Sequence, residues 1–351
     1  MSARPAVFVI VLNWNGCEDT LACLDSIRGL DYPNVRTVVV DNGSTDDSVA
    51  RIAAWAAEKQ PNGSLFSYDR AEAEGGGRLE AEHSLAAPAA ELPLVVVEAG
   101  ENLGFAGGCN VGLRYALAAG AEYAWLLNND TVVEPESLGR LVEFMAGNPT
   151  YAAVTGQIRY HGVPRIWNCG GDLTWYGSRR YHYGEMSTAS VPNSGFRQIT
   201  FMTGCAALFR TEVFRDAGLL TERFFFGEED YELSRRFKRL RLPMACTYDA
   251  VIQHKVGSSI NRGTGDRAAA RYYLYYLNRF IDMRGYYPAV VWHAWRQASL
   301  LYILARLKLA NGEPWSSLQL LRRRLLRDSS SLDGVTRDHF ERVRQGGLEA
   351  L

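Results

Sequence analysis

Tyr123-Ala124-Trp125-Leu126-Leu127-Asn128-Asn129-Asp130 is the stretch that decides the fold, because an apolar run passes without a break into two amides and an acid. An apolar run this short predicts a buried strand, and open α/β sheets bind their ligands at the ends of such strands. Asp130 is therefore a candidate carboxylate for a metal or phosphate site. The alternative is that Asp130 caps the following helix, since Pro135 and Glu136 begin a helical pattern.

Upstream of this stretch, short apolar runs alternate with segments that carry the helical period. The apolar runs are Val7 to Leu12, Thr37 to Val40 and Leu94 to Val97, and the helical segments are Thr20 to Arg28, Asp46 to Lys59 and Cys109 to Ala119. Strands that alternate with helices pair in parallel through right-handed crossovers. The sequence therefore predicts an α/β fold with a Rossmann-like, mainly parallel sheet flanked by helices.

Two segments depart from this alternation. Residues 60–93 hold Gly75-Gly76-Gly77, many Ala and Glu, and few large apolar residues, which predicts an inserted, flexible and largely exposed loop with one short helix. Past Arg271 the chain becomes helical, aromatic and basic. We therefore expect an α/β domain over residues 1–270 and a helical, basic C-terminal extension over residues 271–351.

The six cysteines are scattered, with no CxxC pair and no Cys/His cluster of zinc-site spacing. Such usage is typical of reduced, mostly buried cysteines in a cytosolic protein. The apolar run from Ala6 to Leu12 is short and lacks a small-residue cleavage site, so it predicts a first strand and not a signal peptide. Because the chain has no stretch of 18 uncharged apolar residues, we expect a cytoplasmic protein without an integral membrane span.

Polar clusters also follow the first two predicted strands. Asn13-Trp14-Asn15-Gly16 follows the first strand, and Asp41-Asn42-Gly43-Ser44-Thr45-Asp46 follows the second. Carboxylate, amide and hydroxyl groups at the carboxyl ends of parallel strands can hydrogen-bond a nucleobase and a ribose. Taken singly, each cluster is also what an ordinary strand-to-helix turn uses, so only their combination indicates a nucleotide site.

A glycine-rich cluster precedes the helix predicted from Cys109. It runs from Glu101 to Asn110 and contains Asn102, Gly104 and Gly107. Glycines allow a ligand to approach the backbone closely, and a helix N-terminus favours an anion such as a diphosphate. The cluster is not GxGxxG and follows the third strand, which disfavours a dinucleotide-binding dehydrogenase.

Three acids open a later helix, in Phe224-Phe225-Phe226-Gly227-Glu228-Glu229-Asp230-Tyr231-Glu232-Leu233. Asp230 shares the inner face of that helix with Leu233 and Phe237, and an acid on a buried face is costly unless it is used or paired. The helix dipole helps to keep Asp230 ionised, as a general base requires. Glu229 lies about 100° around the helix, where it can orient an acceptor hydroxyl. Glu228 and Glu232 fit the simpler role of first-turn acids that satisfy the dipole.

His254-Lys255 follows the apolar strand Ala250-Val251-Ile252. A single histidine is commonly structural, but beside a metal-bound diphosphate both an imidazole and a lysine can contact the ligand. His254 is therefore a candidate metal ligand and Lys255 a candidate phosphate contact.

Together, the five clusters from Asn13 to Leu233 resemble, in order and in type, those of the family 2 glycosyltransferases with the GT-A fold, especially their bacterial rhamnosyltransferase-like branch. The resemblance covers roughly residues 5 to 280. It implies an inverting transfer from a nucleotide-diphosphate sugar to a hydroxyl of a glycan or lipid-linked acceptor in cell-surface polysaccharide synthesis, with Mg²⁺ or Mn²⁺. The branch suggests L-rhamnose as the sugar, carried by a TDP or UDP donor.

By position, the resemblance makes Asp230 the catalytic base with Glu229 beside it, and Asp130 and His254 the metal ligands. It places the nucleotide sugar against Asn13, Asn15, Asp41, Asn42, Ser44, Asn102, Gly104, Gly107, Asn110, Asn128, Asn129 and Lys255. Three features depart from the family pattern. Asn128 stands where a DxD motif has its first acid, Leu277 stands where relatives often carry Arg, and the segment of residues 60–93 is longer than usual.

The C-terminal extension carries most of the positive charge. Residues 271–351 hold 13 Lys and Arg against 7 Asp and Glu, whereas the remainder holds 25 against 32. Trp315, Leu318, Leu321 and Leu325 form a helical stripe beside Arg322-Arg323-Arg324, which suits the anionic inner face of the plasma membrane. The alternative is that this helix packs on the enzyme with its arginines solvated. We expect peripheral membrane contact and no nucleic acid partner.

Two other classes of function compete with a glycosyltransferase. A nucleotidyltransferase needs a basic, glycine-rich phosphate loop after the first strand, and Asn13-Trp14-Asn15-Gly16 carries no Lys or Arg. A non-catalytic module that binds a sugar or a nucleotide has no need of Asp130, Asp230 and His254 together. Both classes are therefore disfavoured.

Overall fold

The computed structural model describes residues 4–59, 65–77, 94–256 and 268–351. Eleven strands form one sheet whose main path runs in the order β11-β13-β7-β12-β5-β1-β2-β4-β3, with β6 on β13 and β8 on β7, and β9 and β10 pair separately. The strands are β1 Val7–Asn13, β2 Val35–Asp41, β3 Leu65–Asp69, β4 Leu94–Glu98, β5 Tyr123–Asn128, β6 Thr131–Val133, β7 Ala153–Tyr160, β8 Ile166–Asn168, β9 Gly171–Leu173, β10 Arg179–Tyr181, β11 Phe196–Ile199, β12 Ala206–Arg210 and β13 Met244–His254.

The N-terminal half of the sheet is parallel. Strands β5, β1, β2, β4 and β3 all run the same way, and nearly every residue of β1 and β5 is buried. Strands buried on both faces need near-continuous apolar sequence, which these runs supply. In the other half, β12 lies antiparallel between β5 and β7. The predicted α/β fold with a mainly parallel sheet is therefore confirmed.

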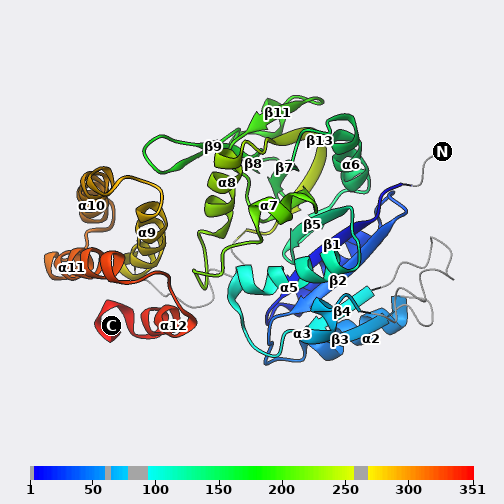
Figure 1. Ribbon diagram of the computed structural model, residues 1–351, viewed down its shortest axis with the longest axis horizontal. Helices are drawn as coiled ribbons and strands as arrows, with labels where there is room; N and C mark the ends of the chain where they lie inside the picture. The colour runs from blue at the N-terminus through cyan, green and yellow to red at the C-terminus, as the bar shows by residue number, and fades with distance from the viewer. Residues whose placement is uncertain (1–3, 60–64, 78–93, 257–267) are drawn as a thin grey trace.

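Helices cover both faces of the sheet (Figure 1). Residues of α5 and α8 pack on one face with Phe8 and Ile10, and residues of α1, α2 and α6 pack on the other with Val7 and Val9. The helices are α1 Cys17–Arg28, α2 Ser48–Lys59, α3 Arg70–Glu74, α5 Gly104–Ala118, α6 Ser137–Gly147, α7 Val213–Ala217, α8 Glu229–Leu240, α9 Ala268–Arg284, α10 Ala289–Asn311, α11 Trp315–Ser331 and α12 Arg337–Gly346, with short 3₁₀ turns at Thr188–Ser190 and Gly347–Ala350.

The predicted inserted loop with one short helix holds only in part where the structure describes it. The short helix α3 is present in residues 65–77, but these residues also form the edge strand β3, which pairs in parallel with β4 and was not predicted. Phe66 and Tyr68 alternate along β3 and are buried in the main core, while the side chain of Asp69 caps α3. A strand of five residues is too short to stand out among the surrounding Ala, Glu and Gly. Residues 60–64 and 78–93 lie outside the described residues.

The C-terminal region is helical, as expected. Helices α9 to α12 gather at one end of the molecule around their own apolar core (Figure 1). Leu318, Leu321 and Leu325 of α11 are buried in that core, so the predicted membrane-facing stripe is wrong and the alternative of a packed helix holds. Only Trp315 of that stripe is largely exposed. Within the described residues, no helix combines the length and apolar character needed to cross a bilayer.

Candidate active site

The parallel pairing brings three of the predicted clusters to one edge of the sheet. Asn13 at the end of β1 is paired with Asp41 at the end of β2, and Leu12 is paired with Asn128 at the end of β5. Side chains separated by more than 100 residues in sequence therefore meet where parallel strands end, which is the usual place for a ligand.

Asp41 lies at the centre of a buried hydrogen-bond network. Its carboxylate accepts hydrogen bonds from Nδ2 of Asn13 at 2.8 Å, and from the backbone N and the Oγ of Ser44 at 3.0 and 2.6 Å. The Oδ1 of Asn13 in turn accepts one from Thr20 at 2.8 Å. The network fixes these side chains before any ligand arrives, and their contact with a nucleotide remains a prediction.

Asn15 also joins the first two clusters, and its backbone N–H donates to Oγ of Ser44 at 3.0 Å. Its backbone adopts a left-handed conformation with φ of 49°, and its Oδ1 accepts a hydrogen bond from the Thr45 backbone at 2.8 Å. It also lines a small pocket with Asp19, Asp46 and Arg51 at the start of α1 and α2.

The glycine-rich cluster forms the first turns of α5, which begins at Gly104 and not near Cys109 as predicted. Nδ2 of Asn42 donates to Oδ1 of Asn102 at 3.1 Å and to the carbonyl of Gly104 at 3.0 Å. Gly104 has a φ of 77°, and a Cβ there would stand 2.1 Å from the carbonyl oxygen of Phe225. A Cβ on Gly107 would stand 2.8 Å from that of Leu103. Close packing therefore accounts for these glycines, whatever their contact with a diphosphate.

Asn110, the last residue of that cluster, is buried with its amide fully engaged inside the protein. Nδ2 donates to the carbonyl of Leu220 at 2.9 Å and to Glu222 at 2.7 Å, and Oδ1 accepts from the Leu220 backbone at 3.1 Å. These bonds fasten α5 to the segment before α8. The structure thus gives Asn110 a structural role, and contact with the nucleotide sugar remains only a prediction.

Asp130 and His254, the two predicted metal ligands, lie together. Nε2 of His254 is 3.0 Å from Oδ1 of Asp130, and both side chains are about 6% exposed. The antiparallel pairing of β13 with β6 sets this distance, because His254 lies opposite Thr131. The alternative that Asp130 caps a helix is wrong, since β6 follows it directly and α6 begins only at Ser137.

The residues present fit a divalent cation that also binds a ligand. A carboxylate oxygen and an imidazole nitrogen are common metal donors, and the buried Nδ1 of His254 has no hydrogen-bond partner among the described residues. No group of three or more His, Cys, Asp or Glu side chains suited to a metal occurs in the described ranges. The described residues therefore offer two candidate ligands, and a cation held by this pair would take further ligands from a substrate and water.

Asn128, Asn129 and Lys255 surround this pair. Nδ2 of Asn129 donates to Thr20 at 3.0 Å, which ties the turn after β5 to α1. The Lys255 backbone donates to the carbonyl of Asp130 at 2.9 Å, and its Nζ is 2.8 Å from Asp19 on α1. Asn128 is half-buried, and its backbone donates to the carbonyl of Cys205 at 2.8 Å.

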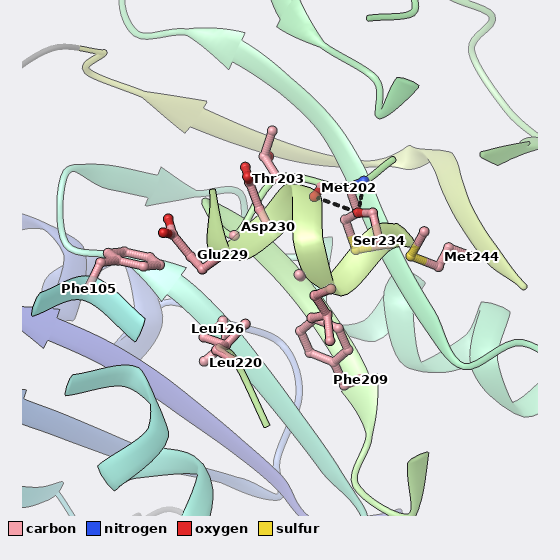
Figure 2. A pocket seen from close by; sticks show the side chains of 13 residues that line it. Phe105, Leu126, Met202, Thr203, Phe209, Leu220, Glu229, Asp230, Ser234 and Met244 are labelled. Atoms are coloured by element: carbon pink, nitrogen blue, oxygen red, sulfur yellow. Dashed lines mark hydrogen bonds between the residues drawn. The ribbon is translucent and has the colours of Figure 1, made fainter. Parts of the chain in front are cut away.

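The two predicted catalytic acids line one pocket at the start of α8. Glu229 and Asp230 share it with Phe105, Thr203 and Ser234, and Figure 2 shows both carboxylates leaving the helix toward the same side. Thr203 lies two residues before Cys205, and the carbonyl of Cys205 accepts a hydrogen bond from the Asn128 backbone. The segment from Thr203 to Cys205 therefore links this pocket to the end of β5.

Burial raises the pKa of both acids. For Glu229 the adjacent Asp230 carboxylate adds to the rise, and for Asp230 the guanidinium groups of Arg179 and Arg279 oppose it. The buried Oε2 of Glu229 has no hydrogen-bond partner in the part of the chain that the structure describes. A carboxylate with a raised pKa and free acceptor capacity is suited to take up a proton.

The charges around this pocket were not predicted from the sequence. Glu228, predicted to be a first-turn acid that satisfies the helix dipole, is buried, and its Oε1 lies 2.5 Å from Nε of Arg279 on α9. Arg179 of β10 reaches the same region. Only the polar residues Asn278, Arg279 and Asp282 within the apolar pattern of α9 could have signalled such a contact.

Comparison with known proteins supports one family. The sequence profile described as "Glycosyltransferase like family 2" matches residues 5–272. The galactofuranosyltransferase GlfT1 of Mycolicibacterium smegmatis is 24% identical over 249 residues, which span 66% of this chain and 80% of that protein.

Two solved structures share the fold. The mannosyltransferase PcManGT from Pyrobaculum calidifontis, in complex with GDP-Man and Mn²⁺, matches with a TM-score of 0.54 at 19% identity over 94% of this chain and 76% of that one. S. aureus TarS 1–349 matches with a TM-score of 0.51 at 14% identity over 92% of this chain and 80% of that one. The fold is therefore that of the GT-A glycosyltransferases, and because the family profile spans most of the chain, this protein belongs to glycosyltransferase family 2.

Proposed function

We propose that this glycosyltransferase is an inverting hexosyltransferase in which Asp230 is the general base. The observation that carries the proposal is the shared pocket of Glu229 and Asp230, which the segment from Thr203 to Cys205 links to the strand end at Asn128. A donor held along the strand ends would present its sugar to that pocket. Asp230 would take the proton from the acceptor hydroxyl as the hydroxyl oxygen bonds to the anomeric carbon and the bond to the diphosphate breaks.

The environment of Asp230 supports this role. Burial makes the carboxylate a stronger base, while Arg179 and Arg279 favour its ionised form. The unpartnered Oε2 of Glu229 could accept a hydrogen bond from the same acceptor and hold its hydroxyl in line.

Asp130 and His254 would hold the divalent cation of the reaction. Its chemistry, when bound, is to neutralise the negative charge that grows on the departing diphosphate. Mg²⁺ prefers oxygen ligands, so a ligand pair that contains an imidazole favours Mn²⁺. That PcManGT was solved with Mn²⁺ supports this preference.

For the donor, we propose a nucleotide-diphosphate sugar with a TDP or UDP carrier, and a glycan or a lipid-linked glycan as acceptor. The branch resemblance favours L-rhamnose, whereas the similar GlfT1 is a galactofuranosyltransferase. Both sugars therefore belong in the donor panel.

The test is nucleoside diphosphate release from a panel of nucleotide sugars, with Mn²⁺, with Mg²⁺ and with EDTA. We expect free nucleoside diphosphate that depends on the metal and increases with acceptor. Pyrophosphate exchange in place of nucleoside diphosphate release would indicate a nucleotidyltransferase, and binding without either product would indicate a non-catalytic module.

We also propose a peripheral membrane contact, through α10 in place of α11. Val290, Leu301 and Leu309 on the outer face of α10 are 82%, 71% and 86% exposed, and the alanines at positions 294, 298 and 305 continue that face between them. The exposed Arg306 lies at its edge. An apolar helix face bordered by basic groups suits an anionic bilayer, where a lipid-linked acceptor would be found.

A further inference from the structure

The backbone that leads into α8 is held in an unusual conformation. Gly227 and Glu228 both have positive φ angles, of 81° and 82°, immediately before Glu229 and Asp230. A left-handed conformation is ordinary for glycine but strained for glutamate, and such strain persists only where the surroundings impose it. The contacts that impose it also set the direction of the two catalytic candidates.

Those contacts come from α9, in the C-terminal helical region. Nε of Arg279 is 2.5 Å from Oε1 of Glu228, and each side chain is only 2% exposed. Nδ2 of Asn278 donates to the carbonyl of Phe226 at 3.0 Å. Two successive residues of α9 therefore hold the two sides of the left-handed turn.

Arg279 also reaches beyond this turn. Its Nη1 donates to the carbonyl of Gly177, in the turn that joins β9 to β10, at 2.7 Å, and its guanidinium carbon lies 3.3 Å from the centre of the Tyr231 ring. The same guanidinium thus contacts α8 on both sides of Glu229 and Asp230, and it fixes the hairpin that carries Arg179. A planar group with several donors can satisfy these directions together, which a lysine cannot.

We infer that Arg279 is a positioning residue that holds the first turn of α8, and with it Asp230, in the orientation needed for proton transfer. The inference rests on the proposed role of Asp230 as general base. The buried ion pair between Arg279 and Glu228 should add little to the stability of the fold, because the cost of desolvating both charges offsets most of their attraction. We therefore assign this pair a role in orienting the first turn of α8.

The positive charge of Arg279 should also affect the pH dependence of the reaction. The titratable groups that face Asp230 are Arg179 and Tyr181 of β10, Arg279 of α9, Glu229 of α8 and Glu228 at the N-cap of that helix. Removing the positive charge of Arg279 would leave the carboxylates less compensated, so Asp230 would ionise only at higher pH. The acidic limb of the pH–rate profile would then move upward.

Arg235 supplies a matched control. It forms the other buried ion pair between α8 and α9, with Asp282, but it lies more than one turn beyond Asp230. Arg235 lies over the Tyr231 ring at 5.3 Å and its charge also reaches Glu228, but its hydrogen bonds go to Asp282 and Met283. Arg235→Gln therefore removes a buried arginine from the same helix interface while leaving the hydrogen bonds of the turn before Glu229 in place.

The experiment compares Arg279→Gln, Arg279→Lys, Arg235→Gln and Asp230→Asn in the full chain, by initial rates across pH and by thermal unfolding. We expect Arg279→Gln to lower kcat by on the order of 100-fold with donor KM nearly unchanged, as small misplacements of a catalytic group do, and to shift the acidic limb upward. Arg279→Lys should keep the limb in place and recover part of kcat. Arg235→Gln should lower Tm while leaving the limb where it was.

The four variants distinguish a failure of the positioning role of Arg279 from a failure of Asp230 as the general base. If Asp230→Asn abolishes turnover while Arg279→Gln leaves kcat and the acidic limb unchanged, the positioning role is overturned and the base assignment stands. An Arg235→Gln variant that loses kcat and shifts the limb as Arg279→Gln does would reduce Arg279 to a general structural role. If Arg279→Gln does not fold, Arg279→Lys decides, because an unchanged kcat in that variant overturns the inference. Turnover retained by Asp230→Asn would overturn both.

Discussion

His254 and Asp130 are joined across two strand ends, with 3.0 Å between Nε2 and Oδ1, and Asn128 stands two residues before the acid. In the absence of a cation, the imidazole is a natural hydrogen-bond partner for the carboxylate. Among the described residues, this site offers a cation the carboxylate of Asp130, and the amide of Asn128 stands where a second acid could be.

This arrangement predicts that Asn128→Asp strengthens the metal site. A second carboxylate adds negative charge near the cation, so the Mn²⁺ concentration for half-maximal activity should fall about tenfold. The measurement is a Mn²⁺ titration of initial rate at saturating donor. His254→Ala is the opposite control and should raise that concentration; equal titration curves for all three proteins would remove both residues from the metal site.

The base assignment predicts a separation of binding from turnover. Asp230→Asn should retain donor binding, measured by thermal stabilisation, and lose roughly 10²- to 10⁴-fold in kcat. Glu232→Gln is the control on the same helix turn, because Glu232 pairs with Arg236 and does not line the pocket. Near-normal turnover in Asp230→Asn would exclude Asp230 as the base.

The buried carboxyl group of Glu229 should make the folded protein less stable at about pH 8 than it is near pH 4. Burial raises the pKa of Glu229 above its ordinary value of 4.5, so the folded state binds this proton more tightly than the unfolded chain does. Stability is therefore lost as the pH rises from the ordinary carboxyl pKa through the raised one. Glu229→Gln should unfold at a higher temperature than the parent protein at about pH 8, by about 1–2 °C for each kcal/mol recovered, with the difference vanishing near pH 4. A variant that gains no thermal stability at the higher pH would contradict the raised pKa.

The exposed face of α10 predicts binding to anionic vesicles. Val290→Asp with Leu301→Asp should reduce co-sedimentation with phosphatidylglycerol vesicles, because both changes place charge on the apolar face. Donor-dependent thermal stabilisation should be unaffected. Leu240→Asp, at an exposed apolar position on α8, is the control. Failure of the parent protein to sediment with such vesicles, or a dimer that these changes disperse, would assign the face to another partner.

The strand ends could be predicted because their signals are local. Each apolar run and its polar terminus lie within about ten residues, and the parallel arrangement then brings Asn13, Asp41 and Asn128 together by register alone. Asp130 and His254 were each predicted as metal ligands from their places after an apolar run. Their meeting depends on the antiparallel pairing of β13 with the three-residue strand β6, which was not predicted.

The charges that support the pocket could not be predicted, because their partners are distant in sequence. Glu228 and Arg279 lie 51 residues apart, and nothing near either one indicates the other. An amphipathic helix could be recognised from the stripe of Trp315, Leu318, Leu321 and Leu325. The spacing of apolar residues does not show, however, whether protein or lipid covers the apolar face. In α5 the glycines marked a close approach correctly, yet the neighbours they meet are parts of the protein, the Phe225 backbone for Gly104 and the Leu103 side chain for Gly107.

The loop before α12 hydrogen-bonds, as a strand would, to the segment that leads into α8: the Phe225 backbone donates to the carbonyl of Val335, and the Val335 backbone donates to that of Arg223, both at 2.8 Å. The family profile ends at residue 272, before Asn278, Arg279 and Val335. The contacts that hold the proposed catalytic acids therefore lie partly outside the segment that defines the family. A chain cut at residue 272 would keep the strand ends at Asn13, Asp41 and Asn128 but lose the hydrogen bonds that fix the turn before Glu229.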